Sequence, residues 1–259
     1  MVRNKLFTSI NIFGMSVSLA CCILLFFYAT NELSFDKHHG STVYRLNSTL
    51  TQKSGEELRA ASSSIPIAYT INTEVPEIEN AARATSSDLF GGKNVIIHEE
   101  NSWYIDKGYI TDTEIFNILK YDIISGNKET PIAHLNGVVL EKQWATTIFG
   151  EDDPIGKMVS ISSMFGISEF EITAVYDKKT YTSHLNPSFF VSMAHSSWDN
   201  FFNKESTNWV GNNMVFTYVK LLPQADPREV DKKIHQIFRY CNSMEELMSL
   251  RGHFKSESQ

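Results

Sequence analysis

Histidines and paired acidic residues are the side chains of this chain that could take part in acid–base or metal chemistry. His38 and His39 are neighbours, and because successive side chains point in different directions, we expect solvated turn residues rather than ligands of one metal. His184 could orient a loop or act as a general base, but no partner carboxylate or nucleophile is evident in the sequence, so we expect a structural role. The acidic residues 99–100 and 151–153 fall on predicted surface turns, where solvated carboxylates are expected.

Motifs for nucleotide hydrolysis or acyl transfer do not stand out. The chain has no phosphate-binding glycine loop and no G-x-S-x-G motif, and Gly91-Gly92-Lys93 is too short to count as one. We therefore expect no catalytic, cofactor-binding or metal-binding residues and no ATP hydrolysis by the chain itself. An outward-facing hydrolase built on His184 is the enzymatic alternative. Residues 198–202, which begin with a tryptophan, could form an exposed lip of a groove.

Composition narrows the class of protein further. The formal net charge is −7, and Lys and Arg are interspersed with Asp and Glu, so nucleic acid is not an expected partner. Cys21 and Cys22 lie in an apolar segment and Cys241 is near the end, which leaves no pair for a disulfide outside that segment. The folded part must therefore rely on its core, as disulfide-free bacterial envelope proteins do.

Residues 6–30 form an uncharged, largely apolar run. At ~1.5 Å per residue, such a run is long enough to cross a ~30 Å hydrocarbon layer as one helix. Arg3 and Lys5 precede it, and positive flanks stay in the cytoplasm, so the flank with Glu32 and Asp36 should lie across the membrane with the rest of the chain. We expect a cytoplasmic N-terminus (1–5), a transmembrane helix (6–30) and a connector (31–42).

Other interpretations of this apolar run fit less well. A cleaved signal peptide has a shorter apolar region and a small-x-small cleavage site, which is missing here. A lipoprotein signal would place its cysteine after the apolar run, and a core helix would carry a polar face. Gly14 and Ser18 are small enough to let another membrane helix approach, although they could equally well simply tolerate lipid.

Periodicity predicts strands mixed with short helices, without regular βαβ alternation, which favours an α+β domain. The predicted strands cover residues 43–47, 78–85, 94–100, 103–111, 137–140, 158–161, 170–176, 188–193 and 215–221. The predicted helices cover residues 64–74, 113–119, 141–149, 226–241 and 243–252. Asp112 or Thr113 is the expected cap of the second helix, and Ser243 opens the last with a capping box.

Five segments, taken in order, resemble ABC-transporter permeases of the MacB/FtsX family. Residues 11–24, with their paired cysteines, resemble the first membrane helix of the Bacteroidota members, and the likeness extends to about residue 238. The family's membrane-exit motif is matched by Glu32, Leu33, Phe35, Asp36, His39, Tyr44 and Arg45. Its core-domain "DPIGK" signature is matched by Asp153, Pro154, Gly156 and Lys157, and its "NSHL" motif by His184.

This resemblance implies a non-catalytic permease subunit in the bacterial inner membrane with a MacB-like periplasmic core domain. A separate cytoplasmic ATPase subunit would bind the ATP, and the permease would transmit the ATPase's motion to the outer domain. The family implies a second permease copy, a periplasmic adaptor, and substrates such as antibiotics, peptides or lipoproteins. The core domain (43–241) would have two lobes, one from residues 43–90 and 168–241 and an inserted one from 91–167, followed by a tail (242–259).

The chain departs from the family pattern at both ends. Family permeases have at least three more membrane helices after the core domain, and the sequence beyond residue 43 offers no further run of that kind. The amphipathic cytoplasmic helix before the first span is also missing. We expect a fragment of a permease or a truncated paralogue. The alternative is a stand-alone, membrane-anchored periplasmic binding module without transport activity. Neither the substrate nor the direction of transport can be inferred from these motifs.

Overall fold

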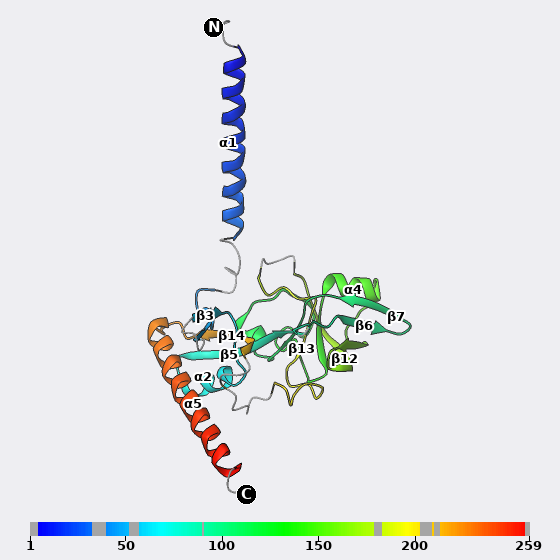
Figure 1. The fold of residues 1–259 in the computed structure, drawn as a ribbon. Helices are drawn as coiled ribbons and strands as arrows, with labels where there is room; N and C mark the ends of the chain where they lie inside the picture. Colours follow the sequence, from blue (N-terminus) through cyan, green and yellow to red (C-terminus); the bar gives the residue numbers. More distant parts are fainter. Residues whose placement is uncertain are drawn as a thin grey trace.

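The computed structural model describes residues 5–32, 40–51, 57–89, 91–178, 183–202, 209 and 213–256. A long N-terminal helix is followed by a sheet-rich domain and a second long helix (Figure 1), which confirms the predicted fold class. The helices are α1 (Lys5–Glu32), α2 (Ile67–Glu74), α3 (Ile115–Ile118), α4 (Lys142–Phe149) and α5 (Pro227–Ser256). The strands are β1 (Val43–Arg45), β2 (Ser48–Thr51), β3 (Glu57–Ala60), β4 (Ser63–Ser64), β5 (Ile78–Ser86), β6 (Asn94–His98), β7 (Asn101–Ile105), β8 (Gly108–Thr111), β9 (Ile123–Gly126), β10 (Gly137–Glu141), β11 (Met158–Ser163), β12 (Gly166–Tyr176), β13 (Phe189–Ser192) and β14 (Asn213–Leu221).

Helix α1 is long and apolar enough to cross a membrane. Its segment Phe7–Thr30 has 24 residues, and none of its most apolar window is buried against the rest of the protein. Figure 1 shows α1 standing apart from the sheet-rich domain. Large apolar side chains are exposed along it, among them Phe13 and Leu24. A helix that is apolar on all sides needs lipid around it rather than water, so α1 anchors the protein in a membrane.

Twelve strands form one continuous sheet in the order β1-β14-β5-β8-β13-β10-β12-β11-β6-β7, with β4 beside β14 and β9 beside β12. The pairs β8–β13 and β10–β12 are parallel, and β2 and β3 form a separate hairpin. The parallel partners β8 and β13 come from the two segments that the sequence assigned to different lobes. The division into two lobes therefore stays a prediction, since the sheet runs through both segments.

Strand β10 is buried on both faces of the sheet, as its unbroken apolar pattern predicted. Val138 and Leu140 belong to one apolar cluster, together with Phe170. Val139 belongs to a second cluster, together with Phe190. Because neighbouring side chains point to opposite faces of a strand, these two clusters are layers on the two sides of the sheet.

Helix α5 packs its first turns against α2 and β14. Asp226 Oδ1 accepts a hydrogen bond from the Arg228 backbone N–H at 2.9 Å, which is the cap that the sequence predicts. Val230 and Ile234 are buried in a third cluster with residues of α2 and β14. The predicted break at Ser243 is wrong, because α5 continues through this position. Extending an existing helix costs less than nucleating a new one, so a capping-box sequence alone does not interrupt it.

Two other boundaries differ from the prediction. The predicted strand 103–111 is divided into β7 and β8, because the chain turns at Lys107, whose φ is +54°. Helix α3 has Glu114 at its N-cap position without a side-chain cap hydrogen bond, so the predicted cap by Asp112 or Thr113 is wrong. The Asp112 carboxylate binds an arginine side chain instead.

Gly126, at the end of β9, cannot carry a side chain without displacing β12. Its φ is +84°, and a Cβ there would lie 2.3 Å from the Thr173 carbonyl oxygen. We predict that Gly126→Ala lowers the free energy of unfolding by about 3 kcal/mol or more, because backbone strain adds to the clash. Gly156→Ala is the matched control, since Gly156 has φ +81° but no atom within 4 Å of the added Cβ. The Gly156→Ala substitution should lower the free energy of unfolding by roughly 1–2 kcal/mol. Equal losses in urea unfolding would contradict the steric argument.

Candidate functional site

A cavity of about 380 Å³ lies where the chain enters the sheet-rich domain after α1. We call it the β1 pocket. It is lined by Gly40, Val43, Tyr44, Arg45, Leu119, His184 and Tyr218. Three of these residues, Tyr44, Arg45 and His184, are positions that the family resemblance singles out. They come from β1 and from the segment before β13, so the fold brings together motif positions that are far apart in the sequence.

Strand β14 supplies the inner wall of the β1 pocket. Arg45 on β1 pairs in register with Tyr218 on β14, and the Tyr218 side chain is buried. His184 Nε2 lies 2.6 Å from the Tyr218 hydroxyl oxygen, within hydrogen-bond distance. The expected structural role of His184 therefore has a physical basis: its ring holds the segment before β13 against β14.

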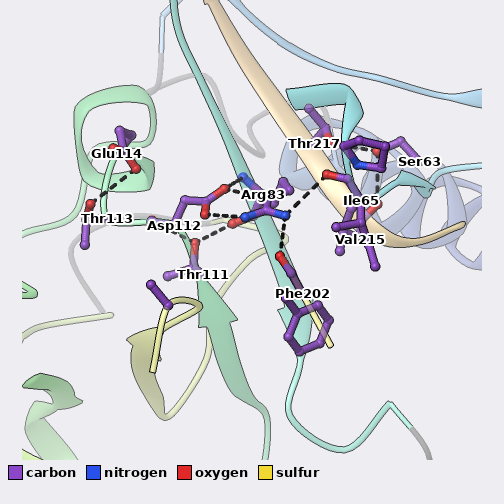
Figure 2. Close-up of polar contacts among 12 residues, drawn as sticks. Ser63, Ile65, Arg83, Thr111, Asp112, Thr113, Glu114, Phe202, Val215 and Thr217 are labelled. Atoms are coloured by element: carbon purple, nitrogen blue, oxygen red, sulfur yellow. Dashed lines mark hydrogen bonds and ion pairs between the residues drawn. The ribbon is translucent and has the colours of Figure 1, made fainter. Parts of the chain in front are cut away.

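Arg83 on β5 is a buried charge that forms a close ion pair (Figure 2). Its Nε and Nη2 atoms donate to the two carboxylate oxygens of Asp112, each at 2.8 Å. The Arg83 backbone N–H also donates to Asp112 Oδ2 at 2.9 Å. This two-pronged arrangement matches the planar guanidinium to the planar carboxylate, which gives the pair a fixed geometry.

The remaining guanidinium nitrogen links Arg83 to two further segments. Nη1 donates to the Phe202 carbonyl at 2.9 Å and to the Ile65 carbonyl at 3.3 Å, as Figure 2 shows. The Arg83 carbonyl accepts from the Thr111 hydroxyl at 2.7 Å. The pair therefore ties β5 to the end of β8, to the segment before α2 and to the turn that follows β13. A buried charge is tolerated only with such complete hydrogen bonding.

Four of the predicted motif positions form the turn between α4 and β11, namely Asp153, Pro154, Gly156 and Lys157. The Gly156 N–H donates to the Ile172 carbonyl at 2.8 Å, and the Ile172 N–H donates to the Lys157 carbonyl at 3.0 Å. These bonds hold the turn against β12. The predicted turn is confirmed, and it does not line the β1 pocket.

The other predicted positions lie on or next to α1. Gly14 and Ser18 are exposed on the helix, and their packing against another membrane helix stays a prediction. Glu32 is the last residue of α1. The remaining motif positions of the membrane exit, Leu33, Phe35, Asp36 and His39, lie outside the described residues.

One prediction about the aromatic residues is wrong. Trp198 and Phe202 are buried in the core, and among the aromatic residues of the predicted groove lip only Phe201 is exposed. The Trp198 indole donates to the Ser192 carbonyl at 2.9 Å, and its ring stacks on Phe170 at 5.9 Å between centroids. An indole with both an apolar partner and an acceptor is stable inside the protein.

His195 is a buried titratable group in the same aromatic layer. Its ring centroid lies 4.7 Å from that of Phe170 and 4.9 Å from that of Trp198. The Ser197 N–H donates to His195 Nδ1 at 3.2 Å, which requires that nitrogen to be unprotonated. Burial lowers the pKa of His195 below its ordinary value, because the charged imidazolium is poorly solvated there.

A second, larger cavity of about 670 Å³ also has His184 in its wall. Lys107, Lys178 and Trp144 contribute to its lining. Among the described residues, no group of three or more His, Cys, Asp or Glu side chains is placed so that it could hold a metal ion.

The geometry defines a membrane-anchored protein whose sheet-rich domain follows directly on its apolar helix. Residues 8–237 match the family model of the MacB-like periplasmic core domain. The chain belongs to this family, and the predicted relationship to ABC-transporter permeases of the MacB/FtsX type is confirmed. The family is a component of transporter permeases and is generally non-catalytic, and it implies partnership with an ATPase subunit. No curated protein matches the chain.

The solved structures that match the chain include the following three. A domain of a protein described as a permease from Porphyromonas gingivalis is 19% identical with a TM-score of 0.62, over 78% of this chain and 82% of that one. The periplasmic region of MacB from Actinobacillus actinomycetemcomitans is 14% identical with a TM-score of 0.50, over 81% and 94%. The extracellular domain of the noncanonic ABC-type transporter YknZ from Gram-positive bacteria is 12% identical with a TM-score of 0.48, over 78% and 93%.

We predict that breaking the Arg83–Asp112 pair from either side strongly destabilises the domain. Arg83→Met or Asp112→Leu should each lower the free energy of unfolding by about 3–5 kcal/mol, because each leaves a buried charge without its partner. The double variant should lose less than the sum of the two single losses, and a chemical-denaturation cycle measures the difference. Lys232→Met, which removes an exposed ion pair with Glu229, is the control and should change stability little. Strict additivity of the two core substitutions would contradict a direct interaction.

The free energy of unfolding should fall as the pH is lowered, and protonation of His195 in the unfolded chain should account for part of this fall. Its pKa is lower in the folded chain than in the unfolded chain, so below about pH 6.5 the unfolded state binds the proton first and unfolding becomes easier. Above that pH the group is neutral in both states and contributes no slope. We predict that His195→Asn flattens the fall in unfolding free energy between pH 7.5 and pH 5.5. The unsubstituted chain, measured in parallel, is the reference for that slope. An unchanged slope in the His195 variant would rule out this assignment.

Proposed function

We propose that this chain is a permease subunit of an ABC transporter that carries ATPase-driven motion across the membrane into its outer domain. The proposal rests on membership of the MacB-like family and on the way the helix and the sheet are connected. In this account the chain performs no chemistry. Its work is to convert a displacement of α1 into a displacement of the whole domain.

The observation that carries the proposal is the pairing of β1 with β14. β1 is the first strand after α1, and β14 is the strand directly before α5. Val43, Tyr44 and Arg45 pair antiparallel with residues 218–220 of β14. The chain therefore enters and leaves the sheet at neighbouring strands, so a pull on α1 acts on the same edge that α5 covers.

The interior of the domain supports movement as one body. β14 pairs along almost its whole length with β5, and β5 carries Arg83. Force that reaches β14 is thus passed to a strand held by the buried Arg83–Asp112 pair. Closely packed interiors transmit strain instead of absorbing it, so the sheet should move as a unit.

The remaining parts of the proposal follow from the family and the charge pattern. We infer that the N-terminus, with Arg3 and Lys5, is cytoplasmic and that the domain is periplasmic, in a bacterial inner membrane. A separate cytoplasmic ATPase subunit would bind ATP, and the chain itself would hold no cofactor. Two permease copies would act together, with a periplasmic adaptor or a substrate such as an antibiotic, peptide or lipoprotein outside.

A stand-alone anchored binding module is the alternative function. The two cavities that share His184 favour it, because ligand sites are concave and of this size range. Purification of the tagged chain from its native membrane separates the two accounts. Co-purification with an ATP-binding subunit supports the permease, and repeated purifications without such a subunit support the anchored module.

If motion passes through the connection between α1 and β1, a flexible insertion in that connection should stop ATP-driven motion from reaching the outer domain. We would insert eight Gly/Ser residues after Gly40, remove the native cysteines and place a spin label at the exposed position 128. In the native complex, ATP should change the distance between labels on the two copies. The insertion should eliminate that change while leaving association with the ATPase intact, because a flexible linker transmits no displacement.

The matched control is the same insertion in the exposed β6–β7 turn, at residues 99–100. That turn lies at the opposite end of the strand order from β1, so the control should keep the ATP-dependent distance change. If the insertion after Gly40 also keeps it, motion does not pass through the α1–β1 connection, and the proposal is wrong.

A further inference from the structure

We propose that the β1 pocket binds the phosphate of a membrane phospholipid headgroup. This site is additional to the proposed transport function, and its test does not require an ATPase. The inference rests on the charges in the pocket, on its mixed polar and apolar lining and on its distance from the membrane helix.

The charges in the pocket favour an anion. Among the described residues that line the pocket, Arg45 is the only Lys or Arg, and none is a carboxylate. Within the described part of the chain, Arg45 has no ion-pair partner within 4 Å, whereas Arg83 is fully paired. A guanidinium presents a planar set of N–H donors that matches phosphate oxygens in a bidentate manner.

The shape and polarity of the pocket favour a phospholipid over inorganic phosphate. Val43 and Leu119 line the cavity together with the polar groups. A volume of about 380 Å³ exceeds the needs of a bare phosphate ion and falls in the range of sites for small organic ligands. The glycerol and first acyl carbons of a phospholipid would cover the apolar side chains while the phosphate meets Arg45.

The length of the chain between Glu32 and Gly40 limits the distance between the β1 pocket and the lipid headgroups. Gly40, a lining residue, is eight positions after Glu32, the end of α1. Eight residues span at most about 28 Å when fully extended. The 28 residues of α1 are ~42 Å long, so its ends reach the headgroup layers beyond the ~30 Å hydrocarbon core. The pocket is lined by residues of β1, the first strand after α1, and of β14, which pairs with β1.

Binding of soluble short-chain lipids to the purified full chain in detergent tests the proposal. The probes are dihexanoyl-phosphatidylglycerol, dihexanoylglycerol, which lacks the phosphate, and inorganic phosphate. Titration calorimetry should detect saturable binding of the phospholipid only, or at least tenfold tighter than either other probe. Equal affinity for inorganic phosphate would show a soluble-phosphate site, and equal affinity for dihexanoylglycerol would show an apolar site. Either result overturns the proposal.

Variants then locate the bound lipid. Arg45→Gln should weaken binding of dihexanoyl-phosphatidylglycerol about tenfold or more, because it removes a charge-assisted contact. Arg59→Gln is the matched control: Arg59 is another exposed arginine near the domain entry, on β3, and does not line the pocket. Because Arg45 is exposed, its variant should keep the melting temperature, which is measured in parallel. If Arg45→Gln binds the phospholipid as tightly as Arg59→Gln does, the β1 pocket is not the site.

Discussion

The burial of Arg83 constrains the whole domain, because its charge is stable there only while three separate segments hold their acceptors in place. Asp112, Ile65 and Phe202 each supply oxygen atoms to the same side chain. If the segment before α2 or the turn after β13 moved away, the guanidinium would lose hydrogen bonds that water cannot replace. This requirement stabilises the relative positions of β5, β8 and their connections, and it limits the ways in which the sheet can deform.

This constraint fits the work of a transporter component better than that of a ligand-closing domain. In the proposed mechanism, motion that enters through β1 would reach β14 and then β5 through continuous backbone pairing. A domain held together in this way changes position more readily than shape. The β1 pocket lies at the point of entry, where Arg45 pairs in register with Tyr218, so a lipid bound there would sit beside the strand that carries the displacement.

Much of the fold follows from local sequence patterns, whereas its long-range contacts do not. The apolar run of α1, the unbroken apolar pattern of β10 and the alternation of β12 predict these elements, because these patterns depend only on neighbouring residues. Arg45 and His184 line the same pocket because of the order of the strands in the sheet, and no local sequence pattern predicts that order. Arg83 has a detectable signal, a charge surrounded by small residues within a strand, but its partner Asp112 looks like an ordinary helix cap. The prediction of an exposed Trp198 is wrong, because a segment that has polar residues between its aromatic residues can still bury those aromatic side chains.

The most direct test of rigid transmission is hydrogen–deuterium exchange of the domain in its native membrane complex, with and without a non-hydrolysable ATP analogue. The account predicts that the amides of β5 and β14 keep the same slow exchange in both states, because the sheet moves without opening. Changes should be confined to the segment between α1 and β1. Faster exchange in β5 or β14 on addition of the nucleotide would show that the sheet deforms, and would contradict the account.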